Sequence, residues 1–156
     1  MTGMALALQE AEKALKEGEV PIGAVLMRGD EILWMDHNRR EQLKDPTAHA
    51  EMLCLRKGAE IKGDWRLSDC TLYVTLEPCP MCAGALIMSR LGQVVYGIAD
   101  PEKGCCGSLY DFPADPAFHT ETRWTSGEQA EGCRRLLDLF FQTVREKHDP
   151  IDAEKL

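Results

Sequence analysis

The apolar residues of the first forty positions change from helical to strand-like spacing. From residue 4 to residue 16 they recur in steps of three and four, which places them on one face of a helix; they are Met4, Leu8, Ala11 and Leu15. Gly18 follows as a candidate C-cap. Two short apolar runs, 22–27 and 31–35, are separated by Gly29 and Asp30, and this pattern predicts a β-hairpin.

The middle of the chain alternates between helix and strand signals. We expect a polar loop at 38–44 and then a helix that begins at Asp45 and Pro46 and ends near Ile61. The β-branched and aromatic run 71–76 predicts a buried strand. A helix over 79–91 and a strand over 93–98 follow, and this order predicts a right-handed parallel crossover.

The last third of the chain begins with a segment rich in Gly, Pro and Asp. Residues 100–120 have weak periodicity and predict a long loop, and 122–125 predict a short strand. A final helix is expected over 128–147, with an apolar side that faces the core and consists of Leu136, Leu137, Phe140, Phe141 and Val144.

Length and composition fit one globular domain that spans residues 1–156. Apolar residues make up 44% of the chain and charged residues 28%, and no apolar run reaches the roughly 20 residues that a bilayer requires. Charged residues interrupt the N-terminal segment, so it does not read as a secretory signal, and we expect a cytoplasmic protein without membrane contact. The net charge of -8 confines any nucleic-acid site to a local patch.

Seven cysteines cannot all pair in disulfides within one chain, and two of them stand close together as Cys79 and Cys82. Metal ligation or free thiols therefore fit better. The other cysteines are expected to be small core or loop residues; they are Cys54, Cys70, Cys105, Cys106 and Cys133.

Two short motifs carry the chemistry. His49 and Glu51 stand two residues apart at a predicted helix start, and the run Glu77-Pro-Cys-Pro-Met-Cys82 opens another helix. One imidazole and two thiolates are three zinc ligands, which leaves the fourth position of a catalytic site open for water. The order H-x-E followed by P-C-x-x-C is the signature of zinc-dependent nucleobase deaminases.

The predicted reaction is a hydrolytic deamination. Zinc, one ion per subunit, lowers the pKa of its bound water toward about 7, and the carboxylate of Glu51 can accept the proton and leave zinc-bound hydroxide as the nucleophile. The same carboxyl group can then protonate the ring nitrogen and the departing ammonia. His49, Cys79 and Cys82 are thus the expected metal ligands and Glu51 the expected proton shuttle.

Beyond the zinc motifs, the chain resembles the bacterial tRNA-specific adenosine deaminases of the cytidine/deoxycytidylate deaminase superfamily. The segments that carry this resemblance span nearly the whole chain; they are 19–25, 37–38, 45–51, 71–79, 81–84, 89–90, 95–97, 107–109 and 140–141.

The resemblance implies a fold, a substrate and partners. The fold would be an α/β domain of three layers, α/β/α, with a central mixed five-stranded sheet, and the protein would be a homodimer. The substrate would be the wobble adenosine, position 34, of tRNA-Arg, flipped out of the anticodon loop and converted to inosine. By position, the residues that contact the substrate would be Asn38, Val20, Pro21, Ile22, Ala50, Asp100 and Lys103.

Two other functions stay open at this point. A small-molecule deaminase of the guanine or cytosine type would use the same zinc site and would need no basic surface. A zinc-stabilised RNA-binding module without turnover would need the metal alone. The presence of Glu51 and of only three ligands favours an enzyme.

Overall fold

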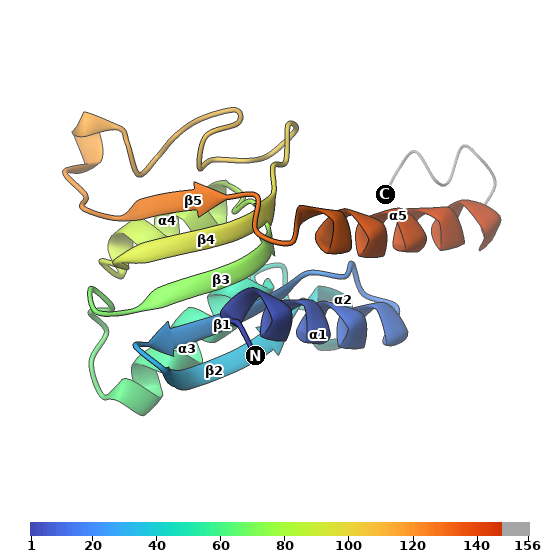
Figure 1. Ribbon diagram of the computed structural model, residues 1–156, viewed down its shortest axis with the longest axis horizontal. Helices are drawn as coiled ribbons and strands as arrows, with labels where there is room; N and C mark the ends of the chain where they lie inside the picture. Colours follow the sequence, from blue (N-terminus) through green and yellow to red (C-terminus); the bar gives the residue numbers. More distant parts are fainter. Residues whose placement is uncertain (148–156) are drawn as a thin grey trace.

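A five-stranded mixed sheet forms the centre of the protein, which a computed structural model describes over residues 1–147 (Figure 1). The strands are β1 Gly23–Arg28, β2 Glu31–His37, β3 Thr71–Leu76, β4 Gln93–Ile98 and β5 Arg123–Ser126, in the order β2-β1-β3-β4-β5. β1 pairs antiparallel with β2 and β3, whereas β3, β4 and β5 are parallel. The predicted mixed sheet, hairpin and parallel crossover are confirmed.

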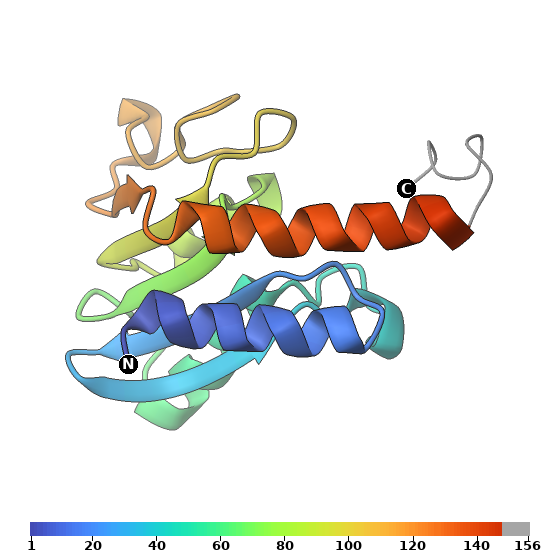
Figure 2. The ribbon, with the colours of Figure 1, turned by 45° about the vertical axis from the view of Figure 1, so that its right-hand side comes forward.

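Helices cover both faces of this sheet. α1 Gly3–Lys16 and α5 Ala130–Lys147 lie side by side on one face, and α3 Ala50–Lys62 and α4 Pro80–Met88 lie on the other (Figures 1 and 2). A short helix, α2 Arg40–Leu43, follows β2. The molecule therefore has the predicted three layers.

The two faces of the sheet bury separate apolar clusters. On the side of α3 and α4, Leu26, Leu72 and Val94 pack with Leu86 of α4. On the side of α1 and α5, Val25 and Val95 pack with Met4 of α1. Alternate residues of β1 and β4 thus point to opposite layers, as the period of two in a strand requires.

The buried face of α1 is narrower than the sequence suggested. Ala7 and Ala14 are fully buried, whereas the predicted stripe residues Leu8 and Leu15 are only partly buried. The reason is the close approach of the helix to β1: a Cβ atom at Gly23 would collide with the backbone of α1. Small residues on α1 permit this contact, and Leu8 packs instead at the junction with α5.

The prediction that a helix begins at Asp45 and Pro46 is wrong. The Asp45 carboxylate accepts hydrogen bonds from the backbone N–H and hydroxyl of Thr47, which makes a local turn, and α3 begins only at Ala50. The preceding loop also contains α2, whose N-terminal N–H groups at Glu41 and Gln42 are bound by the buried carboxylate of Glu19.

The C-terminal helix also departs from the prediction. Only Cys133 of α5 is buried among the described residues, and Phe141, which we expected to face the core, is 39% exposed. Figures 1 and 2 show why: the first turns of α5 lie against β4 and β3, and the helix then extends beyond the ends of the strands. Its later turns therefore have no sheet beneath them.

Within residues 1–147, no helix combines the length and the apolar character needed to cross a membrane.

Candidate metal centre and base pocket

The three predicted zinc ligands come together at the N-terminal ends of α3 and α4. Nδ1 of His49 lies 3.7 Å from Sγ of Cys79 and 3.5 Å from Sγ of Cys82. His49 is the N-cap of α3, Cys79 is the N-cap of α4, and Cys82 lies in the first turn of α4. The ligand atoms of these residues all lie within 4.8 Å of one another.

Local sequence explains why the side chains meet there. His49 and Cys79 both have the extended backbone of an N-cap residue, with ψ values of 153° and 176°. Each therefore stands just before the first turn of its helix. Pro80 occupies the first position of α4, where its missing N–H costs nothing. The backbone N–H of Cys82 binds the Cys79 sulfur, and the positive end of the α4 dipole also favours negative charge there.

This geometry fits a zinc ion. Zinc binds imidazole nitrogen at about 2.0–2.1 Å and thiolate sulfur at about 2.3 Å, and a tetrahedral arrangement then separates nitrogen and sulfur by about 3.6 Å. The two Nδ1 to Sγ distances of 3.7 and 3.5 Å bracket that value. The donor set of one nitrogen and two sulfurs is also typical of zinc.

The pKa values of Cys79 and Cys82 shift in opposite directions, because one proton lies between the two sulfur atoms. The hydrogen bond from Cys82 lowers the pKa of Cys79 to about 4, and His49 adds to this effect. The same hydrogen bond, together with burial, raises the pKa of Cys82. The hydrogen bond to Cys79 in turn raises the pKa of His49. Cys79 is therefore a thiolate at neutral pH and a ready metal ligand.

Glu51 lies in the first turn of α3 and is 4% exposed. Burial raises its pKa from 4.5 to about 7, although the neighbouring charge of His49 and the thiol of Cys82 both favour the ionised form. A carboxyl group with a pKa near neutrality can both accept and return a proton, as a general acid–base catalyst must.

The residues expected to contact the base gather on the segment before β1 and the end of β2. The Asn38 side chain is 6% exposed; its Nδ2 donates to the Val20 carbonyl oxygen, and its Oδ1 accepts from the Arg40 N–H. Pro21 is buried and Ile22 is partly buried. The N–H of Arg39 bonds to the carbonyl oxygen of Ala48, next to His49, so this segment lies beside the metal centre. Ala50 is the first, fully buried residue of α3.

Asp100 and Lys103 lie in the loop after β4. The carboxylate of Asp100 accepts hydrogen bonds from the N–H groups of Glu102 and Lys103. Lys103 is exposed. The Asp100 carboxylate therefore shapes its own loop. The loop reaches the metal centre through Glu77 and Pro78, two residues of the cysteine motif to which the sequence analysis gave no role of their own.

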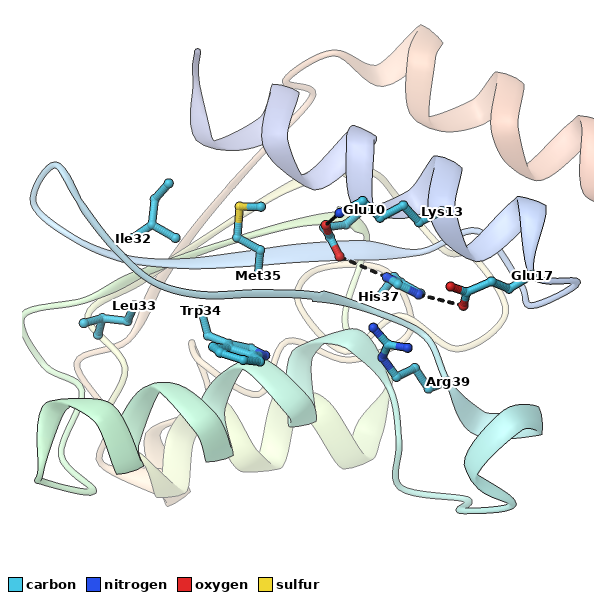
Figure 3. Close-up of a pocket in the computed structure, with 9 residues that line it drawn as sticks. All are labelled: Glu10, Lys13, Glu17, Ile32, Leu33, Trp34, Met35, His37 and Arg39. Atoms are coloured by element: carbon cyan, nitrogen blue, oxygen red, sulfur yellow. Dashed lines mark hydrogen bonds and ion pairs between the residues drawn. The ribbon is translucent and has the colours of Figure 1, made fainter.

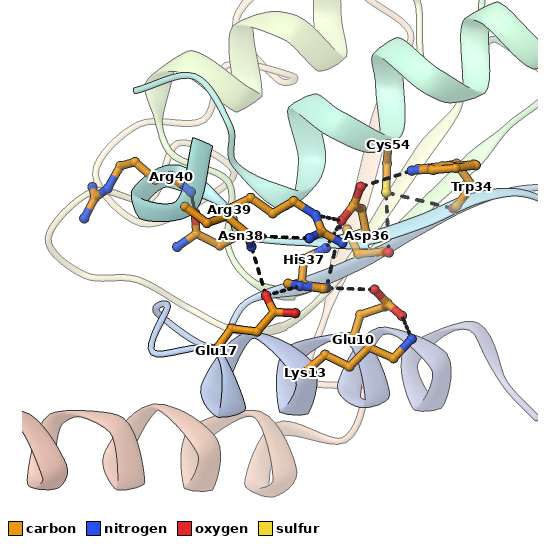
Figure 4. Close-up of polar contacts among 12 residues, drawn as sticks. Glu10, Lys13, Glu17, Trp34, Asp36, His37, Asn38, Arg39, Arg40 and Cys54 are labelled. Carbon is orange, nitrogen blue, oxygen red and sulfur yellow. Dashed lines mark hydrogen bonds and ion pairs between the residues drawn. The ribbon is translucent and has the colours of Figure 1, made fainter. Parts of the chain in front are cut away.

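A second group of metal-type side chains, Glu10, Asp36 and His37, is buried near the end of β2. Glu10 of α1 and His37 of β2 face each other (Figure 3). Its members already have partners. The two ring nitrogens of His37 lie 2.9 and 2.8 Å from carboxylate oxygens of Glu10 and Glu17. Lys13 pairs with Glu10, and Arg39 pairs with Asp36 (Figure 4). We therefore interpret this group as an internal ionic network that fastens α1 to the edge strand.

The network borders an open pocket along β2 that contains no zinc ligand and not Glu51. The sequence carried one signal for it, because Glu10 falls on the buried stripe of α1 between Ala7 and Ala14.

All seven cysteines are free, as expected, and the five outside the metal centre are buried. Trp34 and Trp124 pack against the core. Trp65 is 52% exposed, and the Arg66 guanidinium lies over its ring.

Comparison with known proteins identifies the family. Residues 2–131 match the model of the MafB19-like deaminases. Over 141 residues the chain is 47% identical to the tRNA-specific adenosine deaminase of Bacillus subtilis (strain 168). The aligned region covers 90% of this chain and 88% of the Bacillus protein. The chain belongs to the tRNA-specific adenosine deaminase family. The predicted family and enzyme class are thereby confirmed.

Solved structures agree with this assignment. A structure from a study of A-to-I editing by tRNA:A34 deaminases at the wobble position of transfer RNA is 40% identical, with a TM-score of 0.83 over 86% of this chain and 98% of that chain. This similarity confirms the cytidine-deaminase-like fold. A guanine deaminase from Bacillus subtilis is 35% identical, with a TM-score of 0.59 over 62% of each chain.

Proposed function

We propose that this protein is a zinc-dependent hydrolase that converts the wobble adenosine of tRNA-Arg, position 34, to inosine. The observation that carries the proposal is the meeting of His49, Cys79 and Cys82 beside the buried carboxyl group of Glu51. Membership of the tRNA-specific adenosine deaminase family supports the choice of substrate.

His49, Cys79 and Cys82 would hold one zinc ion per subunit. When bound there, zinc would supply an activated water molecule as the nucleophile. Glu51 would accept a proton from that water and pass it to N1 of the adenine as the bond to C6 forms. It would then take the second proton from the new C6 hydroxyl and give it to the amino group as the C6–N6 bond breaks. Water is consumed and ammonia is released, so the reaction balances without another reagent.

The base would lie against Val20, Pro21 and Ile22 on one side and the start of α3 at Ala50 on the other. The Asn38 amide carries both a donor and an acceptor and can pair with the edge of a purine. To reach these residues the substrate nucleotide must leave its stack, as it can in an anticodon loop. Asp100 and Lys103 would meet the flanking nucleotides.

The test is inosine formation in an anticodon stem-loop of tRNA-Arg, with free guanine, adenosine and cytidine assayed in parallel. We expect inosine with the wild type and a loss of kcat of about 100-fold to 10,000-fold in Glu51→Gln, since that is the usual size of a general acid–base contribution. Glu12→Gln, an exposed substitution of the same kind on α1, should leave kcat unchanged.

Other outcomes of that assay choose between functions. Ammonia release from guanine alone would support a small-molecule deaminase, which the similarity to a guanine deaminase favours as the second candidate. Full activity in Glu51→Gln, with zinc bound, would refute the mechanism. Stem-loop binding without turnover of any substrate would indicate a binding module.

We also propose that two copies of the chain associate. The outward side of α4 carries Met81, Gly84, Ala85 and Met88, and no residue of this helix is charged. Met88 is 75% exposed. An uncharged helix face of this kind is suited to burial against a second copy. Light scattering should give twice the chain mass for the wild type and a smaller value for Met88→Glu; an unchanged mass in the variant would place the interface elsewhere.

A further inference from the structure

Glu77 is a buried carboxylate whose role the reaction scheme leaves open. It follows β3 directly, stands two residues before the ligand Cys79, and is 2% exposed. In the part of the chain that the structure describes, Glu77 makes no ion pair, and its hydrogen-bond partners are neutral groups. A buried carboxylate without a cation is costly unless several donors bind it.

Four donors converge on this carboxylate, and all come from one loop. Oε1 accepts hydrogen bonds from the N–H of Asp100 and the hydroxyl of Ser108. Oε2 accepts hydrogen bonds from the N–H groups of Cys106, at 3.0 Å, and Ser108, at 3.1 Å. Glu77 therefore gathers the two ends of residues 100–108, the segment that contains Asp100 and Lys103.

Packing reinforces these hydrogen bonds. The Cα atom of Gly104 rests against the Glu77 carboxylate so closely that a Cβ atom there would collide with it. The N–H of Cys105 bonds to the carbonyl oxygen of Pro78, the residue between Glu77 and Cys79. The Tyr96 hydroxyl binds the carbonyl oxygen of Cys106 from the other side. The loop is thus fastened to the turn that bears two of the zinc ligands.

We propose that Glu77 is a positioning residue, which fixes loop 100–108 relative to the metal centre so that Asp100 and Lys103 meet the nucleotides that flank the reacting base. This inference rests on the proposed function. Its chemical basis is the number of acceptors: a carboxylate offers lone pairs on both oxygens, whereas the NH2 group of an isosteric amide would face at least one N–H donor in either orientation. An N–H group of the loop that faces the NH2 group has no acceptor, and this cost weakens the attachment of the loop.

The experiment compares the wild type with Glu77→Gln and with Ser108→Ala, which removes one donor. In Glu77→Gln we expect zinc content to be unchanged, KM for the stem-loop to rise about tenfold, and kcat to change less than about threefold, because the loop orders RNA rather than the reacting atoms. Ser108→Ala should shift KM in the same direction by a smaller factor. Glu12→Gln is the matched control for loss of one carboxylate.

Amide hydrogen exchange supplies a readout that does not depend on activity. Exchange over residues 100–108 should accelerate in Glu77→Gln, with α3 unchanged. Unchanged exchange and an unchanged KM in Glu77→Gln would overturn the proposal. If Glu77→Gln instead loses zinc or fails to fold, an unaltered KM in Ser108→Ala would overturn it. If the wild type makes no inosine, the proposed function fails, and stem-loop binding by the variants, read with the exchange data, still decides whether Glu77 positions the loop.

Discussion

Glu51 owes its chemistry to its burial. Its backbone position in the first turn of α3 alone would favour the ionised carboxylate, because the N-terminal end of a helix attracts negative charge. Desolvation outweighs this effect and raises the pKa to about 7.

This environment predicts a pH dependence of stability for chelator-treated protein. Between the unfolded pKa of 4.5 and the folded pKa of about 7, the folded state retains a proton that the unfolded state releases. The free energy of unfolding should therefore fall as pH rises through this window, by on the order of 1–3 kcal/mol. Glu51→Gln should remove this part of the fall.

Urea unfolding of both proteins at pH 4.5, 6 and 8 measures the difference. Other groups that titrate are common to the two proteins and cancel in the comparison. Parallel pH profiles would show that Glu51 is solvated in the metal-free protein.

Short-range spacing was enough to predict the reacting residues. His49 and Glu51 stand two apart, and Cys79 and Cys82 three apart, so each pair is recognisable within one motif. Glu77 was missed because its partners lie 23 to 31 residues away, at Asp100, Cys106 and Ser108. Hydrogen bonds of this kind have no sequence period, and only the folded chain brings their donors to one acceptor.

At the scale of elements, strands were easier to predict than helix ends. The first four strands match apolar runs bounded by turn residues, and β5 lies within one residue of the short strand predicted over 122–125. The start of α3 was misplaced because Asp45 is equally suited to cap a helix or to close a turn, and the bond between Arg39 and Ala48 selects the turn. The face of α5 was misjudged because an amphipathic pattern shows which side is apolar but not how far the sheet extends beneath it.

The contact of α1 with β1 yields a prediction about stability. A methyl group at Gly23 would meet the backbone of α1, which cannot yield as a side-chain tip can. We expect Gly23→Ala to lower the free energy of unfolding by roughly 3 kcal/mol or more, since overpacking that moves backbone lies at the upper end of core substitutions.

Gly132→Ala is the matched control on the same face of the sheet. Its Cβ atom would lie 3.3 Å from the tip of the Leu8 side chain, which can turn aside. The helix propensity of alanine should make this variant about as stable as the wild type or slightly more stable. Equal losses of stability in the two variants would contradict the backbone contact.

At the scale of the whole molecule, a net charge of -8 must be reconciled with a polyanionic substrate. The candidate basic patch beside Asn38 contains Arg39, Arg40 and Lys44. Arg39 is engaged by Asp36 at 2.7 Å, whereas the 47% exposed Arg40 side chain approaches only as far as 4.0 Å to the exposed carboxylate of Glu41. The charge of Arg40 lowers the pKa of His49, against the larger raising effect of Cys79. Arg40 therefore lies within electrostatic range of the metal centre and remains available to a phosphate.

We predict that Arg40→Gln weakens stem-loop binding several-fold and reduces the slope of log K against log salt by about 0.7, the value for one phosphate contact on a single strand. Fluorescence anisotropy from 50 to 300 mM salt measures both quantities. Arg56→Gln, an exposed change on α3, is the control. An unaltered slope in Arg40→Gln would exclude Arg40 as a phosphate ligand.

The strand order has a consequence for how the chain acquires its site. The hairpin of β1 and β2 closes locally, but the central pairing of β1 with β3 joins Ala24 to Val74, across about 50 residues, and must overcome the chain entropy of that separation. Only this pairing brings the turn after β3 to the start of α3. Before β3 pairs with β1, a folding chain holds His49 and the two cysteines apart. The complete set of three metal ligands therefore forms late in folding, when β3 joins the sheet.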